Sequence, residues 1–92
     1  MVTAVVLITA ETVKVPELAE RLAELDGVSE VFSVAGQYDL VALVRVRENE
    51  DLANVISGKM RRLRGITSSE TLIAFKVYSK QDLEAGFALG LD

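Results

Sequence analysis

The sequence contains no cysteine, no histidine and no tryptophan, and it has a single proline. Without cysteine it cannot form disulfides, iron–sulfur clusters or thiolate zinc sites. Without histidine it cannot build a Ser-His-Asp triad or bind a metal through imidazole. The remaining reactive side chains are carboxylates, lysine, tyrosine, serine and threonine, and no cofactor is expected.

Length and charge narrow the class of protein. The 92 residues suffice for one domain, half of them are hydrophobic, and the formal net charge is -4. The hydrophobic content excludes intrinsic disorder, and the acidic balance is unlike that of a free-standing nucleic-acid-binding protein. The first apolar stretch, TAVVLITAE, is too short to span a bilayer and lacks the basic start of a secretory signal. A cytoplasmic protein without a membrane segment is expected.

Hydrophobic periodicity predicts four strands and two helices in the order βαββαβ. Pro16 suits the first turn of the first helix, Gly27 suits its C-terminal end, and Asn49 suits the N-cap of the second helix. This order is typical of an α+β, ferredoxin-like fold, in which a four-stranded antiparallel sheet carries both helices on one face. The predicted strands are residues 3–10, 28–35, 38–47 and 71–78, the predicted helices are 16–25 and 49–63, and a tail, 79–92, with a short helix at 81–89, follows the domain 1–78.

The second face of this sheet is predicted to be apolar as well. In the first strand Ala4, Val6 and Ile8 alternate with Val5 and Leu7, so both faces are hydrophobic. A sheet covered by helices on one face should present polar residues on the other, and a contiguous exposed apolar patch usually marks an interface. We therefore expect a homodimer formed sheet against sheet. The alternative is that the tail folds back over this face.

A tight turn between the second and third strands is the strongest candidate for a binding site. Gly36 permits a positive φ and exposes backbone N–H groups that can receive a carboxylate. Asp39 can pair with an ammonium group, and Tyr38 offers an amphipathic wall. Together they would complement a zwitterion such as a free amino acid. The alternative is that Asp39 caps the backbone of its own turn.

Two other segments have ready structural explanations. The hydroxyl run at residues 67–71 can hydrogen-bond a small polar ligand, but its composition favours the solvated edge of a strand. A basic cluster is interpreted as a solvated helix face, with a nucleic-acid surface as the alternative; it consists of Lys59, Arg61, Arg62 and Arg64. No acid–base pair or activated nucleophile is recognisable, so the chain is not expected to be an enzyme.

The order of elements and the segments VAGQYDLVALVRV and LRGITSSETLIAF resemble the C-terminal domain of Lrp/AsnC transcriptional regulators, called RAM for regulation of amino-acid metabolism. The resemblance covers residues 2–78. It implies that subunits dimerise through their sheets, that dimers associate further into octamers or decamers, and that an amino-acid effector binds between dimers. It also implies that Gly36, Tyr38 and Asp39 form the effector loop, that Ser69 and Thr71 line the same pocket, and that Val34 and Leu40 flank the ligand.

Full-length members of that family carry a helix-turn-helix domain, whereas here the first strand is predicted directly after Met1. The chain thus resembles the stand-alone members, for which direct DNA binding is not expected and full-length regulators are the implied partners. Three alternatives remain: an oligomerisation module without a ligand, a dimeric ferredoxin-like enzyme, and an ACT-type amino-acid-binding domain. The ACT alternative is disfavoured because its glycine-rich loop usually follows the first strand, and residues 10–15 contain no glycine.

Overall fold

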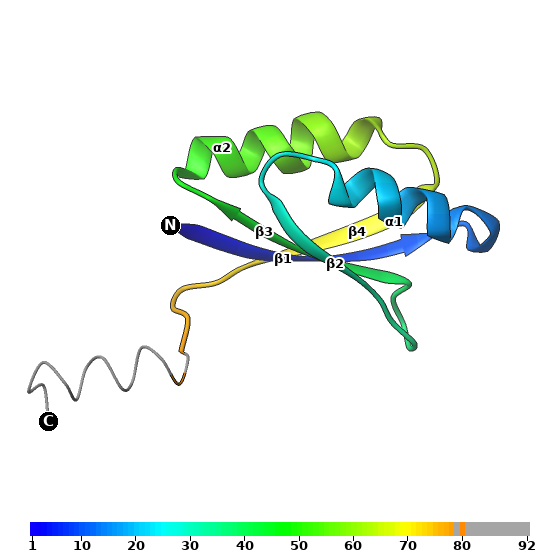
Figure 1. Ribbon diagram of the computed structural model, residues 1–92, viewed down its shortest axis with the longest axis horizontal. Helices are drawn as coiled ribbons and strands as arrows, with labels where there is room; N and C mark the ends of the chain where they lie inside the picture. Colours follow the sequence, from blue (N-terminus) through cyan, green and yellow to red (C-terminus); the bar gives the residue numbers. More distant parts are fainter. Residues whose placement is uncertain (79, 81–92) are drawn as a thin grey trace, which may run out of the picture.

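The computed structural model describes residues 1–78 and Lys80. Its four-stranded antiparallel sheet has the order β2-β3-β1-β4, and the helices cover one face of that sheet (Figure 1). The predicted α+β, ferredoxin-like arrangement is confirmed. The strands are β1 (Val2–Ala10), β2 (Val28–Ser33), β3 (Leu40–Val46) and β4 (Ile66–Ile73); the helices are α1 (Val15–Ala23) and α2 (Asn49–Ala53), with shorter helical segments η1 (Thr12–Lys14), η2 (Asn54–Lys59) and η3 (Met60–Arg62).

The core lies between the sheet and the helices. The predicted alternation along β1 is present, and Ala4, Val6 and Ile8 are the set buried on the helix-facing side. Leu18 and Leu22, one turn apart on α1, pack against them. Burying a large aliphatic side chain stabilises the fold by about 1.5–3 kcal/mol. The other buried residues are Leu40, Ala42, Val44, Val46, Leu52, Val55 and Met60.

The first helix begins and ends earlier than residues 16–25. The 3-10 segment η1 precedes it, and α1 carries Pro16 in its first turn. The chain then reverses at Gly27, whose φ of 95° lies in the region that favours glycine. A Cβ at Gly27 would lie 2.9 Å from Val55 Cγ2, so this turn also needs glycine to pack against the second helical segment.

The second helical segment is not the single α-helix predicted for residues 49–63. The short α2 is followed by the π-helical η2 and the 3-10 segment η3, and η2 contains Gly58, a residue of low helix propensity. The predicted N-cap, Asn49, is wrong. Glu48 is the N-cap because it forms a reciprocal capping box with Asp51, whose Oδ2 accepts the Glu48 N–H at 3.2 Å.

The last strand also lies earlier than predicted, at Ile66–Ile73 rather than at residues 71–78. Gly65, with a φ of 107°, turns the chain directly into β4. At the other end, Ala74 donates its N–H to the Thr3 carbonyl at 2.9 Å, beside the first residues of β1. The ladder with β1 ends at the pair Ala4–Ile73, and residues 74–78 are not part of the strand. The hydroxyl run therefore lies inside the strand and not before it.

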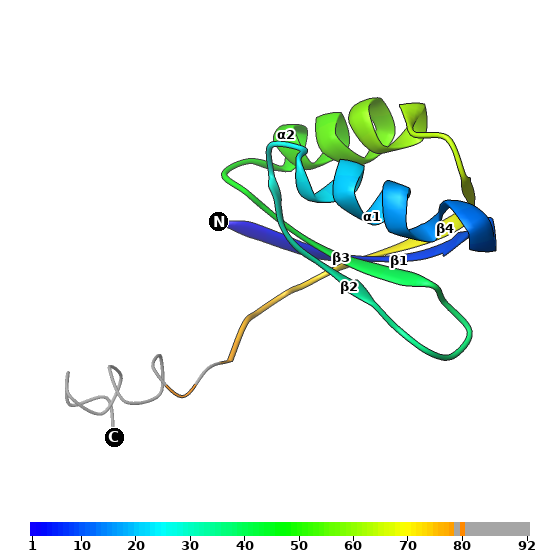
Figure 2. The same ribbon diagram turned by 45° about the vertical axis from the view of Figure 1, so that its right-hand side comes forward.

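The connection between β2 and β3 is longer than the predicted Gly36-Gln37 turn. The flanking strands are shorter than residues 28–35 and 38–47, so residues 34–39 form a loop that projects away from the helices (Figure 2). Asp39 accounts for part of this difference, because its N–H donates to the Ile8 carbonyl at 2.8 Å. That bond pairs the chain with β1 immediately before β3 begins. The loop residues before Asp39 are not part of the ladder between β2 and β3.

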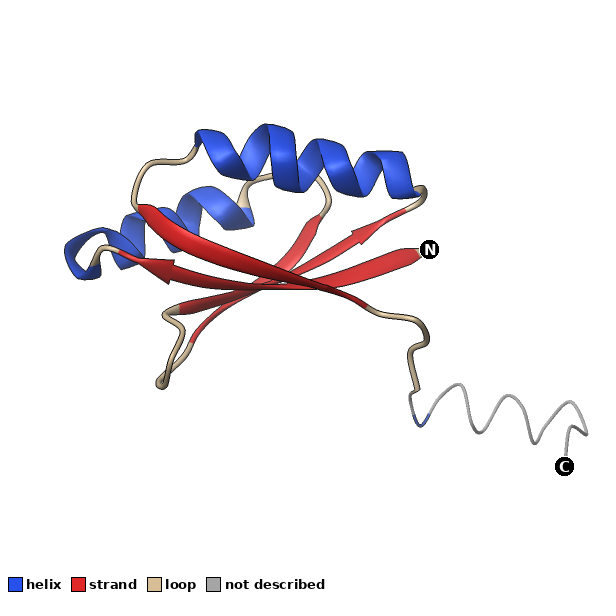
Figure 3. Cartoon of the chain, turned by 180° about the vertical axis from the view of Figure 1, so that it is seen from behind, coloured by secondary structure: helices blue, strands red, loops and turns tan. Residues whose placement is uncertain are grey.

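No described element covers the face of the sheet opposite the helices, hereafter the open face (Figure 3). Its centre is apolar, as predicted, and Phe32 and Leu72 keep 43% and 48% of their surface exposed. The homodimer stays a prediction. The tail helix at 81–89, and the alternative that the tail covers this face, lie outside the described residues. Cross-strand pairing assigns Val5, Leu7, Phe32, Val41, Leu43 and Leu72 to the centre, and Thr3, Glu30, Arg45, Ser68 and Glu70 to the rim.

Candidate functional site

The loop at residues 34–39 carries unused backbone donors. It is closed by a hydrogen bond of 3.1 Å from the Val34 N–H to the Asp39 carbonyl. Within the described part of the chain, the N–H groups of residues 35–38 donate no hydrogen bond. Gly36 has a φ of 138°, and nothing lies within 4 Å of the position a Cβ would take. The loop can therefore present N–H groups to an anionic group such as a carboxylate.

Asp39 fixes the loop to the sheet. Its Oδ2 accepts the backbone N–H of Ala10, at the end of β1, at 2.7 Å, rather than an N–H of its own turn. The other carboxylate oxygen, Oδ1, has no hydrogen-bond partner among the described residues. Asp39 is half-buried, so one oxygen holds the loop in place while the second remains available to a cation.

Tyr38 reaches from the loop to the edge strand β4. Its hydroxyl donates to Glu70 Oε2 at 2.8 Å. The pKa of Tyr38 is raised above its ordinary value of 10.0, chiefly by this hydrogen bond and to a lesser extent by the negative charge of Glu70. The pair thus links the candidate loop to β4 on the side of the open face.

Replacing Glu70 is expected to lower the pKa of Tyr38 in two steps. Glu70→Gln removes the charge but keeps an oxygen acceptor, whereas Glu70→Ala removes both, so the pKa should fall in the order wild type, Gln variant, Ala variant. The measurement is tyrosinate absorbance against pH in a Tyr78→Phe background, because the chain has two tyrosines. Identical titrations of the wild type and the Ala variant would contradict the Tyr38–Glu70 contact.

The same pair makes stability depend on alkaline pH. The folded-state pKa of Tyr38 is raised, so the contribution of the pair is fully present below about pH 10, the ordinary tyrosine value. It is lost as the pH rises through the folded-state pKa.

The remaining predicted site residues lie elsewhere. Val34 is 39% exposed at the start of the loop, whereas Leu40 is completely buried in the core. Ser69 and Thr71 lie on the helix-facing side of β4, opposite to Glu70. The structure brings Tyr38, Asp39 and the loop backbone together, but in the single chain it brings neither Leu40 nor the two β4 hydroxyls into contact with them.

Ser69 and Thr71 line a separate cleft of about 240 Å³ between β4 and the second helical segment. Its walls are about equally polar and apolar, and Arg61 adds a positive charge. The sequence analysis missed Glu70 and Arg61 as site residues. Period-two alternation would have separated Glu70 from its neighbours once β4 was placed at Ile66–Ile73. The other residues of this cleft are Val6, Ile8, Ile56, Ser57, Met60 and Ile66.

Two negative findings concern only the described residues. No helix there is long and apolar enough to cross a membrane. No group of three or more acidic, histidine or cysteine side chains is placed there to hold a metal ion.

Residues 3–83 match the family model described as the Lrp/AsnC ligand binding domain. The match extends beyond residue 78, and the boundary predicted there stays a prediction. A curated relative, an uncharacterized HTH-type transcriptional regulator of Pyrococcus horikoshii, is 37% identical over 59 residues, which are 64% of this chain and 39% of the regulator. The chain thus spans about two-fifths of the length of that relative.

Two solved structures show the same fold. A protein from Thermus thermophilus is 46% identical, with a TM-score of 0.81 over 87% of this chain and 100% of that one. A feast or famine regulatory protein from M. tuberculosis, solved in complex with L-methionine, is 25% identical, with a TM-score of 0.72 over 88% of this chain and 55% of that one.

Proposed function

Because the chain belongs to the Lrp/AsnC ligand-binding domain family, we propose that it is a cytoplasmic amino-acid sensor without catalytic activity. It binds a small amino acid where its dimers meet and acts by changing its own assembly or that of full-length regulators. The L-methionine complex of the M. tuberculosis regulator supports this choice of ligand class. A ligand can shift such an assembly only if it binds one state more tightly than the other.

The loop at residues 34–39 is the observation that carries the proposal. Its free N–H groups suit a carboxylate, and Oδ1 of Asp39, which has no hydrogen-bond partner among the described residues, suits an ammonium group. These are the two charged ends of every free amino acid. Charge-assisted hydrogen bonds of this kind are roughly twice as strong as neutral ones.

The cleft lined by Ser69 and Thr71 supplies the second half of the proposed site. It adjoins β4, an edge strand whose outer backbone groups have no partner strand in the sheet. Tyr38 and the loop contact β4 on the open face, whereas the cleft lies on the helix-facing side of the same strand. We therefore propose that the loop of one subunit and the β4 cleft of its neighbour enclose the effector together, with Val34 beside it. Leu40 supports the loop from the core.

The open face is the proposed dimer interface. Its apolar centre and polar rim correspond to the anatomy of stable protein interfaces. A two-fold axis through the interface would place the apolar centre and the polar rim of one subunit against the same two regions of the other. We further propose that dimers associate into octamers or decamers, so that the loop and the cleft that share an effector belong to different dimers.

Thermal unfolding against a panel of the common amino acids, at millimolar concentration, tests the function. A ligand at about 100 times its Kd adds about 2.7 kcal/mol to the free energy of unfolding. In a domain of this size the midpoint then rises by about ten degrees. A rise confined to one or a few amino acids supports the sensor and identifies its effector class; a uniform response, or none, contradicts it.

A second candidate function is an oligomerisation module without a ligand. It is favoured because two side chains of the proposed site already form hydrogen bonds within the chain, Tyr38 with Glu70 and Asp39 with Ala10. Such a module would form the same dimers and give no response to any amino acid in the panel. The two functions therefore differ in a single measurement.

A further inference from the structure

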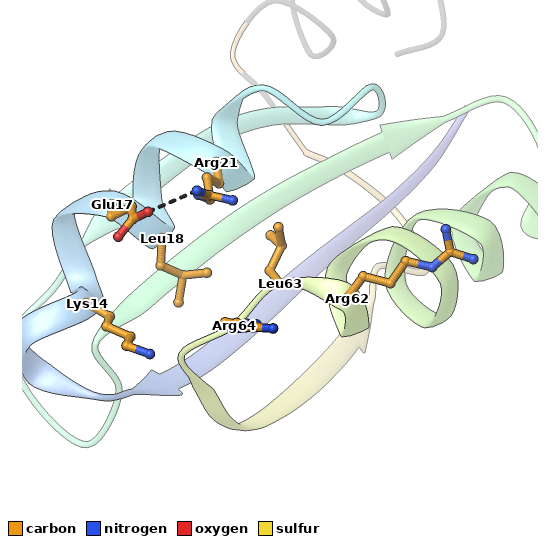
Figure 4. A pocket seen from close by; sticks show the side chains of 7 residues that line it. All are labelled: Lys14, Glu17, Leu18, Arg21, Arg62, Leu63 and Arg64. Carbon is orange, nitrogen blue, oxygen red and sulfur yellow. Dashed lines mark hydrogen bonds and ion pairs between the residues drawn. The ribbon is translucent and has the colours of Figure 1, made fainter.

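A second cleft, of about 340 Å³, lies between α1 and the segment that joins η3 to β4. Figure 4 shows Leu18 and Leu63 at its centre, with Lys14, Arg21 and Arg64 around them. Leu18 is buried in the core and Leu63 is half-buried, so the floor is apolar. None of these residues belongs to the proposed amino-acid site.

The lining carries an excess of positive charge. It contains one carboxylate, that of Glu17, and four cationic side chains, which are Lys14, Arg21, Arg62 and Arg64. Arg21 pairs with Glu17 at 3.0 Å, and Lys14 pairs outside the cleft with Glu11 at 3.7 Å. Among the described residues, Arg62 and Arg64 form no ion pair. This concentration of positive charge stands in a chain whose net charge is -4.

The backbone holds the two walls of the cleft together. The carbonyl of Gly65 accepts the N–H of Glu11 at 2.9 Å, and a Cβ at Gly65 would lie 3.3 Å from Lys14 Cβ. Gly65 therefore allows the segment carrying Arg64 to approach the start of α1 closely. The fold thus holds the backbone of the residues that carry these cations close together, so a ligand need not order the two walls, which lowers the cost of binding.

From this arrangement we propose that the cleft binds a small organic phosphate, with its phosphate groups among Lys14, Arg21 and Arg64 and its less polar part on Leu18 and Leu63. Guanidinium groups bind phosphate oxygens in a bidentate manner. A multiply charged phosphate gains more from several exposed cations than a single carboxylate does. The cleft volume is that of a small-molecule site.

A nucleic acid is the less suitable ligand. Outside the cleft lining, the formal charge of the chain is -7, because the lining contributes +3 (four cations and one acid) to a total of -4. A net negative charge outside the lining disfavours the many phosphate contacts that an extended polyanion makes. A small phosphate would contact the lining alone.

Calorimetric titration of the full chain with pyrophosphate, and with ATP as an organic phosphate, tests the proposal. Arg64→Ala should weaken the binding of both probes at least tenfold, about the effect of losing one hydrogen bond between charged groups. Lys59→Ala is the matched control, since Lys59 is an exposed cation that does not line the cleft. Glu17→Gln should tighten binding, because it removes the only acid from the lining and releases Arg21.

The proposal is overturned by any of three results. The first is no binding of either probe at millimolar concentration. The second is equal weakening by Lys59→Ala and Arg64→Ala, which would indicate attraction to overall charge. The third is binding of a single-stranded oligonucleotide, dependent on Arg64, without binding of the small phosphates. Circular dichroism of each variant confirms that it is folded, and none of these results bears on amino-acid binding.

Discussion

Replacing Val41 with aspartate is expected to prevent the proposed dimer from forming and to leave a folded monomer. Val41 lies at the centre of the open face, with Leu7 and Phe32 as its cross-strand neighbours. In a sheet-to-sheet dimer the new carboxylate would be buried without a partner, and burying an unpaired charge costs several kcal/mol. In the single chain the same position reaches solvent, so the monomer tolerates the change. Size-exclusion chromatography with light scattering measures the mass.

Val13→Asp is the matched control for this experiment. Val13 is 88% exposed on η1, away from the open face, and the variant introduces the same charge by the same substitution. The control should keep the mass of the wild type, and circular dichroism should show both variants folded. A wild type that is already monomeric, or a Val41→Asp variant that remains a dimer, would exclude the open face as the interface.

The architecture could be predicted from the sequence because it depends on the periodicity of hydrophobic residues. Alternation of Ala4, Val6 and Ile8 with Val5 and Leu7 is sufficient to assign the two sides of β1, and leucine spacing is sufficient to find α1. The position of β4 was not accessible in this way. The residues after Ile73 have high β propensity, but a strand also needs pairing, and the ladder between β1 and β4 ends at the pair Ala4–Ile73. The end of a strand therefore depends on pairing as well as on propensity.

The same limit applies to the second helical segment. Leucine, valine and isoleucine recur at helical spacing through residue 63, and this pattern does not distinguish an α-helix from the π-helical and 3-10 segments observed. The N-cap was missed because the capping box uses two acids, Glu48 and Asp51. Asn49, the more usual N-cap residue, lies next to the true cap.

The types of residue in the loop were enough to predict it as the candidate site. The hydrogen bonds that hold the loop could be identified only from the fold. A glycine followed by tyrosine and aspartate suggested a receptor for a zwitterion, and the loop indeed has free N–H groups. That Asp39 bonds to Ala10 and Tyr38 to Glu70 depends on which strands are neighbours in the sheet. Both contacts join segments far apart in the sequence, where spacing carries no information.

Two variants of Asp39 separate its structural role from its proposed role in binding. Asp39→Asn keeps an oxygen that can accept the Ala10 N–H but removes the negative charge. With the amino acid that gives the largest shift in the panel, it should weaken binding at least tenfold and leave unfolding without ligand nearly unchanged. Asp39→Ala removes both, so it should also lower the free energy of unfolding by about 0.5–1.5 kcal/mol, the net contribution of a typical hydrogen bond, since this one is only partly buried.

Asp26→Asn, at an exposed aspartate beside the Gly27 turn, controls for the loss of one charge and should change neither quantity. If Asp39→Asn binds the amino acid as tightly as the wild type, the carboxylate serves only to hold the loop against β1. If binding is lost while the unfolding midpoint without ligand is kept, the negative charge itself is needed, because the hydrogen bond to Ala10 has been preserved. Asp39 would then both position the loop and contact the ammonium group, through different oxygens of one carboxylate.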